Sequence, residues 1–290
     1  MPPEPLVYII LVNWNGRAVT LDCLASLRKS TYPHKKILVV DNASSDGSAD
    51  AIRATFPEAE VLQTGANLRF AGGNNAGIRR ALEEGADMVL LLNNDTTVEE
   101  DFLEPLVRRL ASDPLAGAAG PRIVYHDDPS RIWYAGGRIN FWTGTASHRG
   151  IREPDGAPFD TPGETDYATG CCLITRREVL ERVGLLDTSY FMYAEDADWC
   201  LRARRAGYRI QYEPASRIRH KVSVSSGGHL SFFKIRHKAL STFRFFARHA
   251  RWYHWPVFPW LSVLVNAWAG ARYLAQAALR PALRTHPSAR

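Results

Sequence analysis

Three carboxylates stand together in the stretch MYAEDADWCLRARRAG (192–207), directly ahead of an apolar and basic helical pattern. They are Glu195, Asp196 and Asp198. Acids are common in the first turn of a helix because they bond its free N–H groups and complement the positive end of its dipole. The same rigid position also suits a general base that removes a proton from a hydroxyl group. The stretch alone leaves both interpretations open.

A second motif, NNDTT, follows the apolar run DMVLLL and contains Asn93, Asn94 and Asp95. A carboxylate at the mouth of a strand can hold a divalent cation that bridges a diphosphate. Of these three residues only Asp95 is charged, and the asparagines offer neutral oxygens. A strand-ending turn, with Thr96 or Thr97 capping the next helix, is a structural alternative that is compatible with this function.

Two further polar segments suit the binding of a nucleotide. Asp41 begins DNASSDGS, and its carboxylate can accept the N3–H of uracil or thymine; alternatively it begins an Asx-turn. In NLRFAGGNNAG (67–77), Gly72, Gly73 and Gly77 surround an expected helix start, so backbone N–H groups can approach a phosphate or sugar. The pattern is not G-x-G-x-x-G and follows the third strand, which disfavours a nicotinamide cofactor.

Four apolar runs must form the strands that position these residues. They are LVYIILV (6–12), KILVVD (36–41), EVLQT (60–64) and DMVLLLNND (87–95). Helical patterns lie between them, at residues 18–30, 48–56 and 74–85. This alternation predicts βαβ units and a parallel sheet. Because such sheets bind ligands at the carboxyl ends of their strands, we expect all the polar loops above to meet at one edge.

The remainder of the chain is less regular. Residues 112–165 are rich in Gly, Pro and Asp, and we expect an irregular region there that carries acceptor-binding loops. Residues 166–213 return to a strand, a helix, the acidic stretch and a further strand.

The composition is that of an ordinary globular protein, with 290 residues, 46% of them hydrophobic and 23% charged. The N-terminus lacks a basic n-region and an A-x-A cleavage site, so we expect no signal peptide and a cytoplasmic protein. The four cysteines show no C-x-x-C spacing. They predict reduced, mostly buried thiols and neither a zinc site nor disulfides.

The net charge of +6 is distributed unevenly. Residues 214–290 contain 13 Lys and Arg and no acid, which leaves a charge of −7 for residues 1–213. Within 230–255 the spacing predicts an amphipathic basic helix whose apolar stripe consists of Phe232, Ile235, Ala239, Phe243 and Phe246.

The segment that follows is apolar but short. Residues 257–271 carry no charge, yet 15 residues fall short of the ~20 that a spanning helix needs. A later face has an i, i+4 spacing and consists of Trp268, Arg272, Gln276 and Arg280. We expect residues 230–284 to lie on an anionic membrane surface, with packing on the core or in an oligomer as the alternative.

Six motifs carry a family resemblance. In order they are VNWNG, VVDNASSDGS, NLRFAGGNNAG, LLNNDT, ATGCCLITRREVLERVGLLDTSYFMYAEDADWCLR and RIRHKVSVSSGG. Over residues 6–240 the chain resembles inverting family 2 glycosyltransferases and is similar to bacterial rhamnosyltransferases of cell-wall and O-antigen assembly. The resemblance implies an α/β fold of GT-A type, with a Rossmann-like, mostly parallel central sheet flanked by helices and a basic C-terminal helical extension. It also implies a nucleotide-sugar donor and a divalent metal, Mg²⁺ or Mn²⁺.

The resemblance assigns roles to individual residues. Asp196 is the implied catalytic base and Glu195 is the alternative, while Asp198 braces the loop or an arginine. Asp95 and His220 are the implied metal ligands. The implied nucleotide-sugar-binding residues are Val12, Asn13, Asn15, Asp41, Asn42, Asn67, Gly72, Asn74, Asn93 and Asn94.

The chain departs from the family pattern at two positions. Members often carry an acid where Asn93 stands, which implies lower metal affinity. Arg69 stands where the pattern has Gly, and either contacts the diphosphate or is a surface change. Separately from these departures, we expect Arg202 to be the arginine that Asp198 braces.

The implied reaction moves rhamnose or a similar hexose from a dTDP- or UDP-sugar to a hydroxyl of a glycan or lipid-linked acceptor, by metal-assisted single displacement with inversion. The implied division is a nucleotide-sugar half (1–112), an acceptor and catalytic half (113–229) and basic amphipathic helices (230–290). The enzyme would be peripheral on the inner face of the cell membrane.

Two other functions remain open. One is a nucleotidyltransferase that makes nucleotide-sugars, although VNWNGRAV is a poor match to the Gly-rich loop expected after its first strand. The other is a non-catalytic nucleotide-sugar or membrane-binding module. The acids at 195–198 and the negative body argue against a nucleic-acid partner, and the sequence does not predict an oligomeric state.

Overall fold

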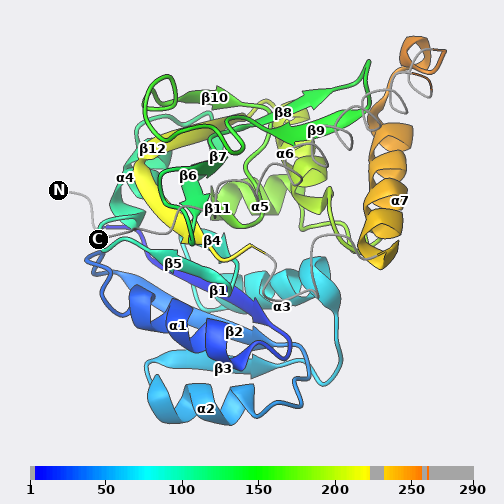
Figure 1. The fold of residues 1–290 in the computed structure, drawn as a ribbon. Coiled ribbons are helices and arrows are strands. Elements are labelled where there is room, and N and C mark those ends of the chain that lie inside the picture. Colours follow the sequence, from blue (N-terminus) through cyan, green and yellow to red (C-terminus); the bar gives the residue numbers. More distant parts are fainter. Residues whose placement is uncertain (1–3, 223–231, 257–259, 261–290) are drawn as a thin grey trace, which may run out of the picture.

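Strands and helices alternate along the first half of the chain, as the apolar runs predict (Figure 1). The structure is a computed structural model that describes residues 4–222, 232–256 and 260. Its strands are β1 (Val7–Asn13), β2 (Lys35–Asp41), β3 (Ala59–Gln63), β4 (Met88–Leu92), β5 (Thr96–Val98), β6 (Ala116–Tyr125), β7 (Ile132–Tyr134), β8 (Gly137–Asn140), β9 (Thr145–His148), β10 (Gly163–Thr165), β11 (Cys172–Arg176) and β12 (Arg209–His220). Its helices are α1 (Arg17–Leu27), α2 (Ser48–Thr55), α3 (Arg69–Glu83), α4 (Leu103–Ala111), α5 (Arg177–Val183), α6 (Glu195–Arg205) and α7 (Phe232–His249), followed by the 3₁₀ turn η1 (Trp252–His254).

The N-terminal half of the sheet is parallel, as expected. Strands β4, β1, β2 and β3 lie side by side in that order, and Asn13 at the end of β1 is in register with Asp41 at the end of β2. The side chains of β4 and most of β1 are buried, which explains why their sequences are continuously apolar. The carboxyl ends of β1, β2 and β4 therefore open at one edge of the sheet.

Strands from the C-terminal half continue the same sheet beyond β4, in the order β11, β6, β12 and β10. Strand β11 is antiparallel to β4 and pairs Cys172 with Leu92, so the loop before β11 lies at the carboxyl end of β4. Strand β12 is parallel to β6 and antiparallel to β5, where it pairs His220 with Thr96. The start of β11 and the end of β12 thus reach the edge where β1, β2 and β4 end.

Strand β6 corrects the expectation that residues 112–165 form an irregular region. Nine of its ten residues are buried, and it lies between β12 and β11. Its small residues allow close neighbours, since a Cβ on Gly117 would lie 2.6 Å from Cβ of Tyr208. The Gly, Ala and Pro content that resembles a loop is here that of a tightly packed strand, because packing overrides propensity. Residue 112, the expected boundary between the two halves, follows α4 and precedes β6, and strands from both sides of it belong to the same sheet.

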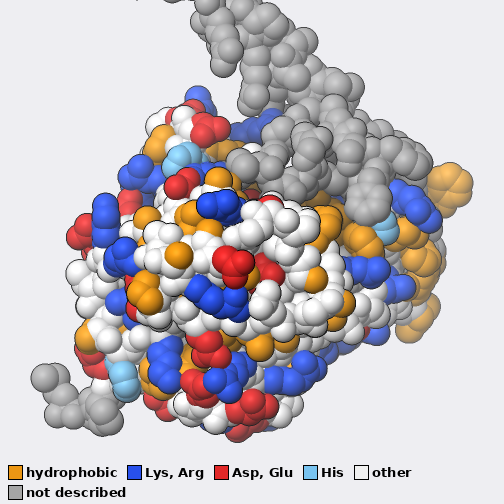
Figure 2. Space-filling view, turned by 90° about the horizontal axis from the view of Figure 1, so that it is seen from below, with side chains coloured by type: hydrophobic (Ala, Val, Ile, Leu, Met, Phe, Trp, Pro, Cys, Tyr) orange, Lys and Arg blue, Asp and Glu red, His pale blue; other side chains and the backbone are white. Residues whose placement is uncertain are grey.

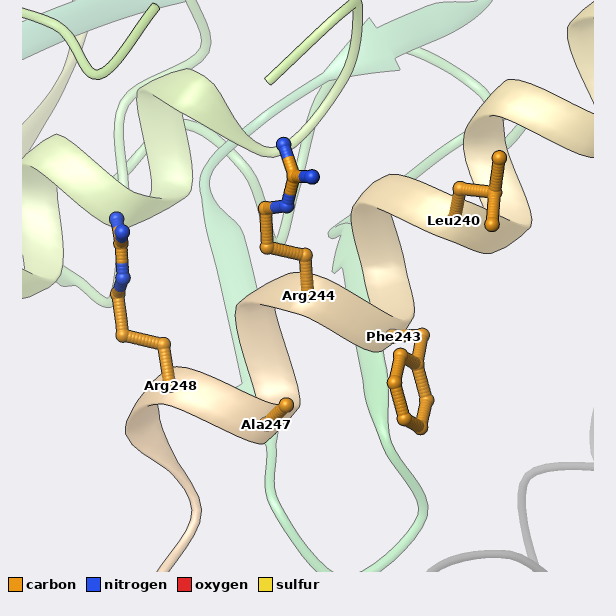
Figure 3. A pocket seen from close by; sticks show the side chains of 5 residues that line it. All are labelled: Leu240, Phe243, Arg244, Ala247 and Arg248. Carbon is orange, nitrogen blue, oxygen red and sulfur yellow. The ribbon is translucent and has the colours of Figure 1, made fainter. Parts of the chain in front are cut away.

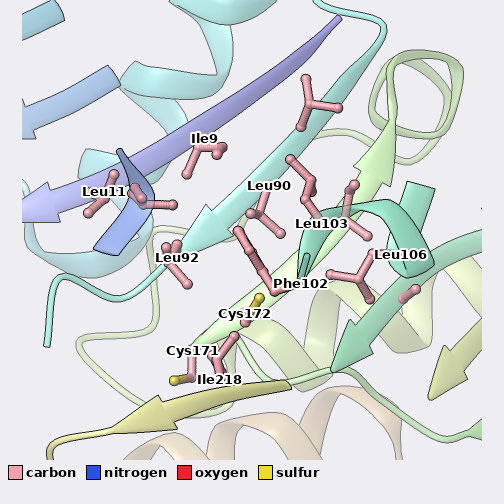
Figure 4. Close-up of a cluster of buried hydrophobic side chains, with 14 of the residues drawn as sticks. Ile9, Leu11, Leu90, Leu92, Phe102, Leu103, Leu106, Cys171, Cys172 and Ile218 are labelled. Atoms are coloured by element: carbon pink, nitrogen blue, oxygen red, sulfur yellow. The ribbon is translucent and has the colours of Figure 1, made fainter. Parts of the chain in front are cut away.

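Two buried apolar clusters cover the two faces of the sheet. Along β1 the side chains alternate, with Ile9 and Leu11 in one cluster and Tyr8 and Ile10 in the other. Helices α1, α2 and α4 pack in the first cluster, part of which Figure 4 shows, and α3, α5, α6 and α7 pack in the second. Both clusters combine residues from the two halves of the chain, so the sheet has one core on each side.

The four cysteines are buried and free, as the sequence predicts. Burial raises the pKa of the Cys23 thiol to about 12, and the pKa values of the other three thiols are also raised by burial. These groups belong to the core.

Helix α3 begins at Arg69, earlier than the expected start at residue 74. The glycines of the stretch 67–77, Gly72 among them, therefore lie inside the helix and do not form a loop. Gly77 is buried, and a Cβ there would lie 2.6 Å from Cγ2 of Ile10. This glycine allows α3 to approach β1 closely.

Helix α7 lies along one side of the molecule (Figure 1). Its Phe245 stacks on Phe141, with ring centroids 6.2 Å apart. The packed face differs from the expected stripe, because Phe243 is 57% exposed. Ser241 and His249 are buried beside the packed phenylalanines, where both make polar contacts that a pattern of apolar residues does not reveal.

Several expected segments lie outside the described residues. They are 223–231, 257–259 and 261–290, together with the side chains of Phe232 and Ile235, and they include Trp268, Arg272, Gln276 and Arg280. Within the part of the chain that is described, no helix is both long enough and apolar enough to cross a membrane.

Candidate active site

Asn13, at the end of β1, is the centre of a hydrogen-bond network at the sheet edge, and its side chain is fully buried. Its Oδ1 accepts hydrogen bonds from Thr20 Oγ1 at 2.9 Å and from Asn94 Nδ2 at 3.2 Å. Its Nδ2 donates to Asp41 Oδ1 at 2.9 Å and to Ser44 Oγ at 3.0 Å. The network joins the loops after β1, β2 and β4 into one unit.

Asp41 is fully buried, and both of its oxygens are bonded within the protein. Oδ1 accepts the hydrogen bond from Asn13, and Oδ2 accepts one from the backbone N–H of Ser44 at 3.1 Å. These contacts match the structural alternative, in which Asp41 begins a turn. Recognition of a base by Asp41 requires the turn after β2 to open, and stays a prediction.

Two expected binding residues shape the start of α3. Asn42 Nδ2 donates to the backbone oxygen of Arg69 at 3.0 Å, and the backbone N–H of Arg69 donates to Asn67 Oδ1 at 2.8 Å. Together they hold Arg69 at a φ of 63°, which is disfavoured for a residue with a Cβ. Asn74 is buried and donates to Phe70 O at 2.9 Å, so its amide stabilises the helix and is not exposed to a ligand.

The other expected binding residues lie at different depths along the same edge. Val12 and Gly72 are half-buried. Asn15 is exposed, and its Oδ1 accepts a backbone hydrogen bond of 2.7 Å from the loop after β2. The backbone N–H of Asn93 donates to Cys171 O at 2.9 Å, which joins the end of β4 to the loop before β11.

Asp95 and His220, the two expected metal ligands, meet at this edge. The pairing of β5 with β12 sets Thr96 opposite His220, which brings the preceding Asp95 within 3.2 Å of His220 Nε2, measured from its Oδ1. Both side chains are buried, and Trp133 packs edge-on against the imidazole with ring centroids 4.4 Å apart. His220 Nδ1 is buried with no hydrogen-bond partner among the described residues.

This pair fits one part of a divalent metal site. Carboxylate oxygen and imidazole nitrogen are suitable ligands for Mn²⁺, and Mg²⁺ is commonly held by one or two carboxylates plus substrate phosphates. Within the described residues, no group of three or more His, Cys, Asp or Glu could hold a metal ion. A diphosphate and water could supply further ligands, and the assignment stays a prediction.

Glu195 and Asp196 occupy the first turn of α6. Glu195 is 6% exposed, and its Oε2 is buried with no hydrogen-bond partner among the described residues. Burial and the neighbouring charge of Asp196 raise the pKa of Glu195 to about 8. Burial also raises the pKa of Asp196, an effect opposed by N–H donors at 2.8 Å from Gly170 and Ala197. Because the charge of Asp196 acts on Glu195, the two carboxyl groups titrate as a pair.

Asp198 is a bracing residue, as expected, and Arg202 is one of its partners. It is fully buried, and it accepts hydrogen bonds from Arg202 Nε at 2.8 Å, His249 Nε2 at 2.7 Å and Tyr190 Oη at 3.1 Å. Burial alone would raise the pKa of Asp198, but the hydrogen bonds from His249 and Arg202 hold it below its ordinary value. Both of its oxygens are thus bonded inside the protein.

The loop before β11 lies between the Asp95–His220 pair and the Glu195–Asp196 pair. Cys171 O accepts the N–H of Asn93, and the neighbouring Gly170 donates its N–H to Asp196. After burial, the charges of Asp95 and Asp196 are among the causes that raise the pKa of the Cys171 thiol. Asp95 and Asp196 therefore flank the same short loop.

Sequence reasoning missed several residues that support this arrangement. Thr20 also accepts a hydrogen bond from Asn94 Nδ2, at 2.8 Å. In the sequence, nothing distinguishes it from the other polar residues of the helical pattern. Gly170 belongs to the ATGCC motif, so its proximity to the acids could have been proposed. Trp133 lies in a region that reads as irregular, and only the β6–β7 pairing reveals its position.

Residues 8–184 match the family model described as Glycosyl transferase family 2. The chain belongs to glycosyl transferase family 2. It is 30% identical over 258 residues to the N-acetylglucosaminyl-diphospho-decaprenol L-rhamnosyltransferase of Mycobacterium tuberculosis, covering 81% of this chain and 82% of the relative. It is 25% identical over 224 residues to the dTDP-rhamnosyl transferase RfbF of Shigella flexneri, covering 76% of this chain and 70% of that one.

A solved structure shares the fold. It is the crystal structure of GalNAc-T7 with UDP, GalNAc and Mn²⁺, with a TM-score of 0.64 at 15% identity. The match covers 84% of this chain and 48% of that chain, so this chain spans about half of its length. The expected α/β fold of GT-A type is confirmed.

Membership of family 2 makes the chain a glycosyltransferase, an enzyme of the hexosyltransferase type similar to rhamnosyltransferases. This decides in favour of sugar transfer over the two alternative functions. The matched region includes Asp95 but ends before Glu195 and His220. The roles of those residues therefore depend on the geometry of this chain.

Proposed function

We propose that this family 2 enzyme transfers rhamnose, or a similar hexose, from a dTDP- or UDP-sugar to a hydroxyl group of a lipid-linked glycan acceptor, with inversion. The observation that carries the proposal is the arrangement of two pairs around the loop before β11, the carboxylate–imidazole pair of Asp95 with His220 and the carboxyl pair of Glu195 with Asp196. The relatives' names support the donor and the acceptor, since one is a dTDP-rhamnosyl transferase and another acts on a decaprenol-linked diphosphate sugar.

In the proposed reaction the acceptor oxygen attacks the anomeric carbon of the donor. The bond from that carbon to the diphosphate oxygen breaks, and the diphosphate leaves with the bonding electrons. The attacking hydroxyl must lose its proton, and the carboxylate of Asp196 accepts it. Gly170 and Ala197 fix that carboxylate through backbone N–H donors. A single displacement inverts the configuration at the anomeric carbon.

Glu195 has a supporting role in this mechanism. With a pKa of about 8, it is mostly protonated at pH 7 and can donate a hydrogen bond to the acceptor. Its Oε2 has no partner among the described residues, which suits an atom that bonds a substrate. Protonated Glu195 also leaves the negative charge of the pair on Asp196.

Asp95 and His220 are the proposed holders of a divalent metal at the donor diphosphate. When bound, Mg²⁺ or Mn²⁺ neutralises charge on the leaving diphosphate. The related structure of GalNAc-T7 contains Mn²⁺ together with UDP, which supports a metal of this kind. The network around Asn13 holds the loop after β1 and the loop of Asn94 together beside this site.

We also propose that the enzyme is cytoplasmic and binds an anionic membrane surface through its C-terminal part. Among the described residues, the large apolar side chains exposed on α7 and after it are Leu240, Phe243, Trp252, Tyr253, Trp255 and Trp260. In Figure 3, Arg244 and Arg248 extend from successive turns of α7 toward the same side, and Phe243 projects away from them. In Figure 2, hydrophobic and basic side chains lie together at the side of the molecule where Figure 1 draws α7. Exposed aromatic side chains beside basic ones suit anionic lipid.

The first test of the donor site is the thermal stability of the protein with dTDP, UDP or GDP, each with and without Mn²⁺ or Mg²⁺. A ligand at about 100 times its Kd adds about 2.7 kcal/mol of stability. We expect metal-dependent stabilisation by dTDP or UDP that is lost in Asp95→Ala and retained in Asp101→Ala, a matched change of an exposed acid.

The second test is transfer from dTDP-rhamnose to a polyprenyl-diphosphate-linked N-acetylglucosamine, followed by NMR of the anomeric configuration. We expect an inverted product. A retained configuration would refute the single displacement, and the absence of any nucleotide response would refute the donor site.

A further inference from the structure

A strained turn precedes the carboxylate pair. Tyr193 and Ala194 have φ values of 68° and 70°, in the left-handed region that residues with a Cβ rarely adopt. Helix α6 begins at the next residue, Glu195, so the orientation of the pair depends on this turn. Such a backbone persists only where the surrounding structure holds it.

Helix α7 contacts the chain just before this turn. Ser241, which is 4% exposed, donates from Oγ to the backbone oxygen of Met192 at 2.7 Å. The ring of the preceding residue, Phe191, stacks on His237 of α7 with centroids 4.0 Å apart and an interplanar angle of 21°. The guanidinium of Arg69 lies 3.9 Å over the same ring. Two consecutive residues are thereby held from α7, and one of them also contacts the start of α3.

A second group of contacts joins α7 to α6 itself. His249 Nε2 lies 2.7 Å from Asp198 Oδ1, and a guanidinium nitrogen of Arg205 lies 2.8 Å from His249 Nδ1. Because a guanidinium only donates, Nδ1 accepts, and Nε2 carries the hydrogen that is donated to Asp198. Arg248 also pairs with Asp187, earlier in the same loop. The loop and the first turn of α6 are thus bound to one face of α7.

We propose that α7 is a positioning element for the reaction, with Ser241 and His249 as its positioning residues. The proposal rests on the proposed function of Glu195 and Asp196. By anchoring Met192 and Asp198, α7 keeps the strained turn closed and holds the two carboxyl groups in one orientation. The C-terminal basic segment therefore contributes to the active site through its inner face.

The test compares two serine variants with the same chemistry. Ser241→Ala removes the hydroxyl that bonds Met192, and Ser216→Ala removes a buried hydroxyl that donates to the backbone oxygen of Phe102 at 2.5 Å, between β12 and the start of α4. Both changes remove a buried hydroxyl-to-carbonyl bond, but only the first touches the turn. Ser241→Thr keeps the hydroxyl and serves as the rescue variant.

The first readout is amide hydrogen exchange of residues 193–198, measured by mass spectrometry. Loss of one hydrogen bond corresponds to about a five- to tenfold change in the equilibrium constant for opening the turn. We therefore expect amide exchange in Ser241→Ala to be faster by that factor. Exchange in Ser216→Ala and Ser241→Thr should match the wild type. Exchange does not require a substrate, so this readout is independent of the proposed reaction.

The second readout is kinetic. We expect kcat to fall by about five- to tenfold in Ser241→Ala with KM for the donor unchanged, because the donor loops are not touched. The rise of kcat with pH should also move to lower pH, since a loosened turn admits water and relieves the burial that raises the pKa of the base Asp196.

His249 provides a second pair of variants. His249→Ala removes the donor to Asp198, and His249→Gln retains an N–H, so the glutamine variant should recover most of the exchange protection and of kcat. Equal effects of Ser241→Ala and Ser216→Ala, or wild-type exchange and kcat in Ser241→Ala, would overturn the proposal. If the wild type transfers no sugar, the proposed function fails, and the exchange measurements alone decide whether α7 holds the turn.

Discussion

The buried carboxyl group of Glu195 should make the protein less stable as the pH rises. Its pKa is about 8 in the folded protein, against an ordinary value of 4.5. Between these values the folded protein holds a proton that the unfolded chain has lost. The free energy of unfolding therefore falls with rising pH by about 1.4 kcal/mol per pH unit, and the loss is complete above the folded pKa.

Glu195→Gln should abolish this dependence, because the amide resembles the protonated carboxyl group in shape and cannot ionise. The variant should be close to the wild type in stability at pH 5, and more stable by about 3 kcal/mol at pH 7.5. Urea unfolding at a series of pH values measures both free energies, and equal m-values would show that the unfolding transition is the same.

Glu100→Gln is the control, since Glu100 is exposed. Its difference from the wild type should not change with pH. If the Glu195→Gln difference were equally constant, the buried carboxyl group would not carry a proton at neutral pH, and its proposed role as a hydrogen-bond donor would be refuted.

Three further predictions concern the base, the packing and the tail. Asp196→Asn should lower kcat by about 10²- to 10⁴-fold through loss of the general base while nucleotide stabilisation persists; near-normal turnover of the folded variant would move the base elsewhere. Gly77→Ala should lower the free energy of unfolding by about 1–3 kcal/mol, because the added Cβ would lie 2.6 Å from Cγ2 of Ile10; a gain in stability in urea titrations would contradict the close packing. Phe243→Glu should weaken sedimentation with anionic vesicles by about tenfold or more, and unchanged binding would show that this face of α7 does not touch lipid.

The parallel half of the sheet could be predicted because each of its strands is recognisable from its own consecutive residues. Each buried strand is a continuous apolar run, and each ends in a polar loop, as at Asn13, Asp41 and Asn93. Strand β6 was not predicted. Its small residues are needed because neighbours such as Tyr208, which are distant in the sequence, pack closely against it. The pattern of a single chain segment contains no information about such a neighbour.

The residue types of the site could be predicted from the sequence, but most of the contacts between them could not. The acids at its centre stand out by residue type and position, but the meeting of Asp95 with His220 depends on the β5–β12 pairing and came only from the family resemblance. The burial of Asp41 and the anchoring of the turn by Ser241 depend on hydrogen bonds between distant segments. A periodicity argument placed Phe243 and Phe246 in one apolar stripe, although Phe246 is buried and Phe243 is exposed, because it counts apolar residues and gives no weight to buried polar ones.

The four core cysteines also determine how this protein can be handled. Each is buried, and each has a raised pKa, so almost no reactive thiolate exists at neutral pH. The folded wild type should therefore resist maleimide reagents. A cysteine introduced by Phe243→Cys would be exposed and would react selectively, without removal of any native cysteine. Fluorescent or spin probes can thus be attached to the outer side of α7 in the otherwise unmodified protein.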